Sequence, residues 1–480
     1  MEFLACGRQY RDLAGWQAYG VVPSTPSDQA CKLYDAAVYG YYRWGCTPDP
    51  ASPIAALEAA VALDEHFVTA HVAIAALLVA SSGSPAVSAG SPAVSKALAN
   101  AAAGLRHGRS IQPWEELLMQ GTIHAAHGRL QRAVECWEEV LLLEPCEPLS
   151  LKLLHDLYFL LGQSRQMRDS IARVIEQYDA SRHGQSIYGN VRGMYSFALE
   201  ECGDYGRAHM YATEALELDR LDSWATHARF HVFEMQGKAE RGLEFGLATE
   251  SEWSQSPNLM CHNYWHMALY HVRLGRGSEA LELFRRRIEP RAVASGEMLD
   301  LVDASALLYR LELAGMSVER ELYRPLVRVW ETHIDDHFSV FNDTHLLMTM
   351  LGSGSDCGAL QSRFFESARA FVADDGEREC EVTNRGLTRR IGLPLMDAMV
   401  AFNEHDYAKS VRLLEPLRYD MVNIGGSHAQ RDVYELLLLK AAMHCNDERE
   451  RRLARALLAE RHQNNRSMVV DHLAGDHHQQ

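Results

Sequence analysis

The chain has 480 residues, of which 47 % are hydrophobic and 23 % are charged. This balance is typical of globular proteins, and the length exceeds what one small core accommodates. The formal net charge of −17 argues against nucleic acid or an anionic membrane as a partner, since such binders draw their affinity from Lys and Arg.

Cysteine usage and the distribution of apolar residues exclude further classes. The ten cysteines are scattered without a Cys-x-x-Cys pair, which argues against zinc ribbons, thioredoxin-like sites and disulfide frameworks. The first residues lack a basic segment followed by an apolar core, and no run of about 18 apolar residues occurs. We therefore expect a soluble, cytoplasmic protein.

The N-terminal part, residues 1–112, is predicted to consist of helices. Its segment 55–80 has the pattern of two consecutive amphipathic helices. Residues 81–95 are rich in Gly, Ser and Pro and contain a tandem duplication of GSPAVS. This composition predicts a flexible insertion between two helices.

The central part, residues 113–372, contains an internal repeat. A glycine recurs between amphipathic segments at intervals of 34, 41, 34 and 38 residues. Tetratricopeptide repeats are helix-turn-helix units with a period of about 34 residues. Glycine accepts the left-handed backbone conformation that ends a helix. The turn glycines are Gly128, Gly162, Gly203, Gly237 and Gly275.

The unit from Trp114 to about Glu147 fits this repeat best. Gly121 occupies a position where the two helices approach closely, and Trp137 fills the gap between them. A later unit, GSEALELFRRRIEP, is predicted to close at Pro290, because proline interrupts a helix.

The C-terminal part follows a loop-like stretch that begins at residue 373. Helical hairpins are predicted over 373–464 and a flexible tail over 465–480. The stretch GGSHAQRDV, residues 425–433, is interpreted as a helix cap, with an anion site at its Gly-Gly pair as the alternative. No alternating strand pattern is sustained, so we predict an all-α protein of about nine to eleven stacked helical hairpins.

Two neighbouring helices each carry two histidines at helical spacing. His227 and His231 are four residues apart, Glu234 follows three residues later, and His262 and His266 are again four apart. Residues four apart on a helix share one face. The pattern therefore predicts four imidazoles and a carboxylate in one region.

Several segments resemble the tetratricopeptide repeat protein 38 family. They include CKLYDA at 31–36, DSWATHARFHVFEM at 222–235, CHNYWHMALY at 261–270, FNDTHLLM at 341–348 and GGSHAQRDV at 425–433. The resemblance runs from about Cys31 to about Arg461 and implies a right-handed superhelical solenoid of stacked tetratricopeptide-type hairpins. It implies no particular activity.

The resemblance also implies that the first helix of each unit lines a concave groove. With each turn glycine as the fixed point, and with Gly352 taken as the turn glycine of a later hairpin, polar and aromatic side chains fall on the groove face. The candidate ligand-binding residues are Asp156, Glu200, Trp224, His227, His231, Glu234, His262, Trp265, His266, Asp303, Asn342 and Asp343.

Two interpretations of the histidines stay open. His227, His231, His262 and His266 could ligate a divalent metal such as zinc, iron or manganese, with Glu234 or Asp303 completing the shell. Alternatively, the imidazoles hydrogen-bond to one another and to groove carboxylates. By contrast, His155 and His345 are interpreted as core residues.

The sequence leaves two functions open. The first is a binding protein whose polar groove holds a peptide or protein partner. The alternative is an enzyme or small-molecule binder with its site in the same groove, with or without a metal. No Ser-His-Asp order, P-loop or dinucleotide fingerprint is recognisable in the sequence, so no catalytic residue is assigned.

Overall fold

The computed structural model describes residues 10–44, 52–82, 90–107, 111–178, 187–373 and 382–464. Every regular element in these ranges is a helix, which confirms the all-α prediction. The predicted tail at 465–480 and residues 83–89 of the predicted insertion lie outside the described residues. The described residues form two compact units.

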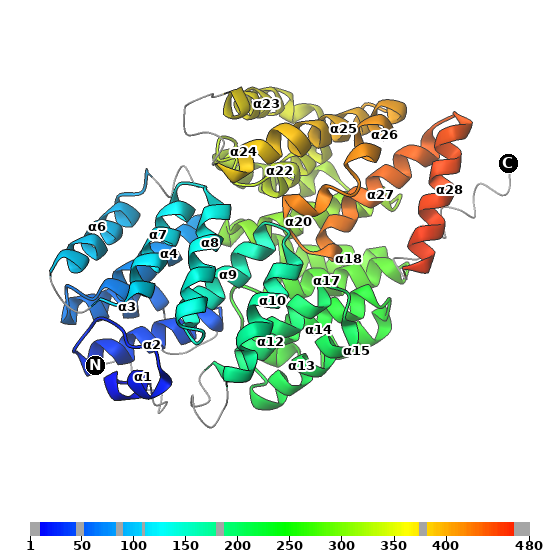
Figure 1. Ribbon diagram of the computed structural model, residues 1–480. Coiled ribbons are helices and arrows are strands. Elements are labelled where there is room, and N and C mark those ends of the chain that lie inside the picture. The colour runs from blue at the N-terminus through cyan, green and yellow to red at the C-terminus, as the bar shows by residue number, and fades with distance from the viewer. Residues whose placement is uncertain are drawn as a thin grey trace. The chain divides into compact units, whose positions relative to one another are not determined.

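The first unit comprises residues 10–228 together with 252–258 and 382–383. Helices that follow one another in the chain pack side by side, as for α7 with α8 and α12 with α13 (Figure 1). Its helices are α1 (Leu13–Tyr19), α2 (Asp28–Tyr42), α3 (Pro53–Leu63), α4 (Val68–Ser82), α6 (Pro92–Arg106), α7 (Pro113–Ala126), α8 (Leu130–Leu143), α9 (Pro148–Leu160), α10 (Ser164–Val174), η2 (Ile175–Gln177), α12 (Tyr188–Glu200), α13 (Tyr205–Leu218) and the start of α14 (Ser223–Met235).

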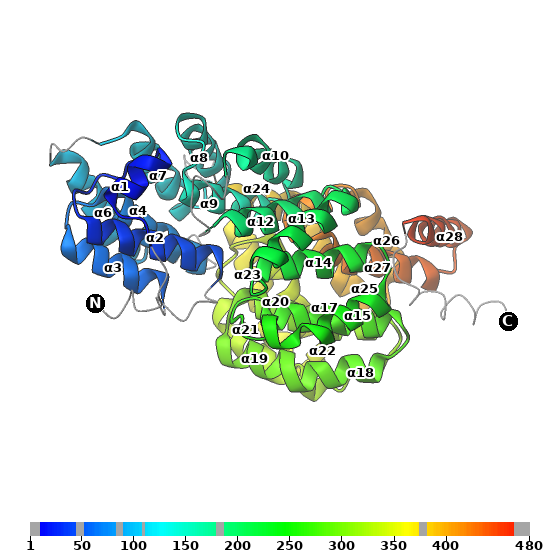
Figure 2. The ribbon, with the colours of Figure 1, turned by 90° about the horizontal axis from the view of Figure 1, so that it is seen from below.

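The second unit comprises residues 229–251, 259–373 and 384–464. In it, α20 packs against both α17 and α22 (Figure 2). Its helices, after the end of α14, are α15 (Ala239–Ala248), α17 (Met260–Arg273), α18 (Gly277–Leu283), η3 (Phe284–Ile288), α19 (Glu289–Ser295), α20 (Met298–Leu313), η4 (Arg320–Leu322), α21 (Arg324–Trp330), η5 (Glu331–His333), α22 (Val340–Ser353), η6 (Gly354–Cys357), α23 (Gly358–Ala373), most of α24 (Thr383–Leu387), η8 (Thr388–Gly392), α25 (Leu393–Asn403), α26 (Tyr407–Leu414), η9 (Glu415–Leu417), η10 (Met421–Ile424), α27 (His428–His444) and α28 (Glu448–Gln463). The short helix α16 (Glu250–Trp253) falls on the division between the units.

Helix ends are set by residues that the sequence makes recognisable. Ser27 and Ser52 begin α2 and α3, since each hydroxyl accepts a hydrogen bond from the N–H three residues later. Ser91 begins α6 in the same way, so this helix starts within the segment predicted to be an insertion. All five predicted turn glycines have a positive φ, between 66° and 80°, which confirms their role in ending helices.

Two of the predicted helix boundaries are wrong. The helix that was predicted to close at Pro290 continues from α18 through η3 into α19 and ends at Ser295. The segment η3 is a π-helix, a wider turn. In an α-helix the ring of Pro290 would meet the carbonyl of Arg286, and the wider turn relieves this contact. The π-helix η8 precedes Pro394 in the same way.

The second difference concerns the turn after α22. Gly352 lies inside this helix, and the residue with positive φ is Gly354, at 79°. A methyl group on Gly352 would lie 2.2 Å from the ring of Tyr323, so close helix packing explains this glycine. The groove positions assigned to Asn342 and Asp343 by counting from Gly352 therefore shift by two residues.

Among the described helices, none combines the length and the apolar character needed to cross a membrane.

Substitution of Gly121 tests the close helix approach in α7. A methyl group there would lie 2.4 Å from Nε1 of the buried Trp137, so Gly121→Ala should cost about 1–3 kcal/mol of stability. A methyl group on Gly206, near the start of α13, would have nothing within 4 Å, so Gly206→Ala should be neutral or stabilising by up to ~1 kcal/mol. Urea denaturation measures both, and equal effects would contradict the packing assigned to Gly121.

Candidate functional site

Helices α14 and α17 bring four histidines together. His227 and His231 lie one turn apart on α14, and His262 and His266 lie one turn apart on α17. The four side chains are 4 %, 0 %, 3 % and 0 % exposed in chain order. Sequence spacing therefore identified the pairs correctly, and packing has removed all four from water.

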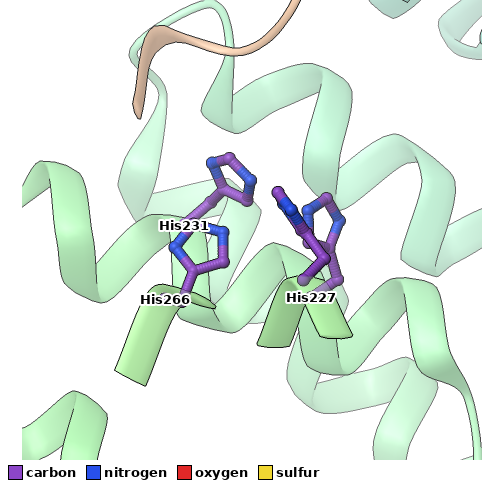
Figure 3. A group of neighbouring side chains, drawn as sticks. His227, His231 and His266 are labelled. Carbon is purple, nitrogen blue, oxygen red and sulfur yellow. The ribbon is translucent and has the colours of Figure 1, made fainter. Parts of the chain in front are cut away.

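The nitrogen atoms of these histidines converge. One ring nitrogen from each of the four lies within 4.8 Å of the others. Figure 3 shows the rings of His227, His231 and His266 gathered around one region. The ring centroids of His231 and His266 are 4.3 Å apart. The division between the two compact units falls after Ala228, within the continuous helix α14 that carries both His227 and His231.

Burial keeps the centre of this cluster uncharged. Loss of water lowers the pKa of His231 well below its ordinary value, and the neighbouring His266, His262 and His428 lower it further. A neutral imidazole offers a lone pair to a partner, which is the form that ligates metals.

His262 is oriented by a carboxylate. Its Nδ1 lies 2.7 Å from Oδ2 of Asp303, which is 1 % exposed. An ionised carboxylate only accepts hydrogen bonds, so Nδ1 carries the hydrogen and Nε2 is the nitrogen that presents a lone pair. Asp303 also accepts from Nε2 of Gln430 at 3.3 Å. This is the arrangement by which proteins fix the tautomer of a ligating histidine.

Aromatic rings pack against the cluster. Trp265 stacks on His262 with centroids 5.2 Å apart, and Phe230 stacks on His266 at 6.0 Å. Trp265 is fully buried, so its ring contributes to the wall of the cluster. These contacts hold the imidazoles in one orientation and exclude water from them.

Glu234 does not join the four histidines. It lies three residues after His231 on α14 and is half-buried. Burial raises the pKa of Glu234 to about 7, against the lowering influence of Arg273 and Arg310. Within the described part of the chain, the carboxylate of Glu234 is not one of the ligand atoms that converge with the four histidine nitrogens.

Helix α27 supports the site from a distant part of the chain. Ser427 and Gln430 form a reciprocal cap at its start, which confirms the helix-cap interpretation of GGSHAQRDV. Arg310 of α20 donates to the carbonyls of Ala429 and Gln430, at 2.5 and 3.0 Å. Sequence reasoning missed Arg310 and Gln430 as supporting residues, because only the fold brings the start of α27 next to α20.

Asp156 and Trp224, two candidates of the first unit, have partners within that unit. Asp156 accepts from Nζ of Lys152 at 2.6 Å and from the hydroxyl of Tyr41 at 2.7 Å. The buried ammonium of Lys152 also lies 5.0 Å from the ring of Trp224. Asp156 therefore forms an ion pair within the unit, and Trp224 packs against the cation of that pair.

Two further residues that the sequence singles out, the candidate Glu200 and the core residue His155, lie in the first unit. Glu200 lies on α12 and is fully buried. His155, interpreted from sequence as a core residue, is also fully buried, with its ring 5.1 Å from that of Trp224. Burial beside Lys152 lowers the pKa of His155 well below its ordinary value, so it is a neutral core residue.

Asn342 and Asp343 lie at the start of α22, away from the histidine cluster in sequence. The backbone N–H of Asn342 donates to the hydroxyl of Ser339, which caps the helix. Asp343 is buried, and its carboxylate lies 3.2 Å from Nδ1 of His337. Nδ1 of His345 donates to the carbonyl of Phe341 at 2.7 Å, as expected of a core histidine.

No known protein-family model matches the chain. The resemblance to the tetratricopeptide repeat protein 38 family therefore stays a prediction.

The raised pKa of Glu234 gives a pH-dependent effect on stability. Its folded value of about 7 lies above the ordinary 4.5, so the unfolded chain loses this proton first as pH rises, and folding stability falls between these two values. Glu234→Gln removes this loss, so the variant should gain stability relative to the wild type from pH 5 to pH 8. Glu240→Gln, at an exposed position on α15, is the matched control. Thermal unfolding at both pH values measures the difference, and a constant difference for Glu234→Gln would contradict the assignment.

Proposed function

We propose that the protein binds one divalent transition-metal ion between α14 and α17, through His227, His231, His262 and His266. The observation that carries the proposal is the convergence of four buried ring nitrogens within 4.8 Å of one another. Two pairs of histidines at a spacing of four residues place two ligands on each helix, which is a common way to build such a site.

The distances suit an ion after a small adjustment. A tetrahedral zinc ion with bonds of about 2.0–2.1 Å holds its ligand atoms about 3.4 Å apart. The observed limit of 4.8 Å therefore requires side-chain movements of about 1 Å. Asp303 supplies a buried negative charge next to His262, which offsets part of the charge of a divalent ion.

The nature of the donors narrows the choice of metal. Imidazole nitrogen suits zinc, iron, copper and nickel, whereas manganese favours oxygen donors. Of the three metals considered from sequence, the all-nitrogen set favours zinc or iron over manganese. Four protein ligands fill a tetrahedral shell, which suits a structural zinc ion, while an iron ion with more positions would keep room for a small ligand.

A second candidate function is a tetratricopeptide-type scaffold that holds a peptide or protein partner. It is supported by the left-handed glycines at the ends of successive paired helices and by the resemblance, which implies the right-handed solenoid. One observation argues against a basic peptide as the partner. Three carboxylates predicted to line the groove already contact a basic side chain or a histidine of their own unit; they belong to Asp156, Asp303 and Asp343. We therefore place the metal site first and the scaffold second.

Metal content tests the proposal directly. Protein purified without a histidine tag or chelator should contain about one equivalent of zinc or iron by inductively coupled plasma mass spectrometry. The double variant His231→Gln, His266→Gln should lose it. His345→Gln, which alters a buried histidine whose Nδ1 donates to a backbone carbonyl, should retain it. The proposal is contradicted if the wild-type protein is metal-free and also fails to take up added zinc or iron. The histidines would then serve only in hydrogen bonding.

Asp303 should affect metal affinity without being a ligand. Asp303→Asn keeps the shape of the side chain but removes the charge that orients His262, so affinity should fall about 10- to 100-fold while stoichiometry stays at one. Competition with a chromophoric chelator measures the affinity. An unchanged affinity would show that His262 needs no orienting carboxylate.

A further inference from the structure

Three side chains in the second unit form a hydrogen-bonded series that sequence reasoning did not detect. The hydroxyl of Ser367 lies 3.0 Å from Nε2 of His337, and Nδ1 of the same histidine lies 3.2 Å from Oδ2 of Asp343. A hydroxyl, an imidazole and a carboxylate in this order are the components of an activated nucleophile.

The imidazole is held firmly between its two partners. His337 and Asp343 are each 3 % exposed, whereas Ser367 on α23 is half-buried and accessible. His337 has a φ of 43°, a left-handed conformation that is uncommon outside glycine. Nδ2 of Asn384 donates to the carbonyl of His337 at 2.6 Å, which fixes the backbone there. Strained residues of this kind concentrate at functional sites.

We propose that Ser367 is a nucleophile towards activated carboxylic esters, with His337 as its general base and Asp343 as the group that orients the imidazole. The buried carboxylate accepts from Nδ1–H, so Nε2 carries the lone pair that faces the serine hydroxyl. The rings of Phe364 and Phe371 pack on the imidazole, at 5.9 and 5.3 Å, and shield it from water.

The chemical step balances within these residues. Oγ of Ser367 forms a bond to the ester carbonyl carbon while its proton passes to Nε2 of His337. The carbonyl electron pair then returns, the bond to the leaving alcohol breaks, and His337 gives its proton to that alcohol. Water repeats the sequence on the acyl-serine and releases the carboxylic acid.

A second carboxylate competes for the serine hydroxyl. Asp335 also accepts a hydrogen bond from Ser367, and this bond, with that from Arg363, lowers the pKa of Asp335. Arg363, one turn before Ser367 on α23, lies 2.6 Å from Asp335 and balances its charge. Because the hydroxyl has one hydrogen, it donates to one acceptor at a time, and donation to His337 is the reactive arrangement.

A fluorophosphonate probe, which phosphonylates nucleophilic serines with loss of fluoride, tests the proposal on the full chain. Mass spectrometry should find one adduct, mapped to Ser367, and none in Ser367→Ala. Ser362→Ala is the matched control, since Ser362 is exposed on the same helix and donates to the carbonyl of Gly358, and its adduct yield should equal that of the wild type. Absence of an adduct on Ser367 in the wild type would overturn the proposal.

Two more variants separate a general base from a merely structural histidine. His337→Asn retains a residue that tolerates the left-handed backbone and should slow the labelling of Ser367 at least about 100-fold. Asp335→Asn removes the competing acceptor and should leave labelling equal or faster. Circular dichroism confirms folding of each variant. Wild-type labelling rates in folded His337→Asn, or slower labelling in folded Asp335→Asn, would overturn the assignment of His337 as the base.

Discussion

Four imidazoles can share one buried region only while most of them stay uncharged. Each proton added there would lose hydration and repel its neighbours, which is why the pKa of His231 lies well below its ordinary value. Asp303 is a buried carboxylate that contacts the cluster, through His262. Its charge would offset part of the charge of one divalent ion held by neutral ligands.

The surroundings of the cluster come from separated parts of the chain. Asp303 lies 41 residues after His262, and Gln430 lies a further 127 residues along the chain. Arg310 connects the same two helices, α20 and α27, through backbone carbonyls at the start of α27. The orientation of one imidazole on α17 thus depends on how α27 begins, so the helix cap at Ser427 serves the site as well as its own helix.

The sequence predicts local geometry well and tertiary partners poorly. Spacing of four residues sufficed to place His227 with His231, and a recurring glycine located five of the turns, because both signals follow from the helix itself. Asp303 was predicted from sequence as a residue that could complete a metal shell, and in the structure its carboxylate contacts Nδ1 of His262. The meeting of Ser367 with His337, 30 residues apart in the chain, carries no comparable signal. Their meeting depends on how helices pack, and neither the spacing nor the composition of the segments records that packing.

The π-turns before Pro290 and Pro394 have a consequence for rotational register. One extra residue in a turn rotates everything that follows by about 100° around the helix axis. The π-helix η3 therefore sets the direction in which the buried face of α19, which includes Ala292, points. Replacement of Pro290 by a residue with a backbone N–H would allow η3 to adopt α-helical geometry. The buried face of α19 would then rotate away from α20 and α21, which α19 now contacts. A proline that looks like a stop signal thus fixes the direction in which the continuing helix faces.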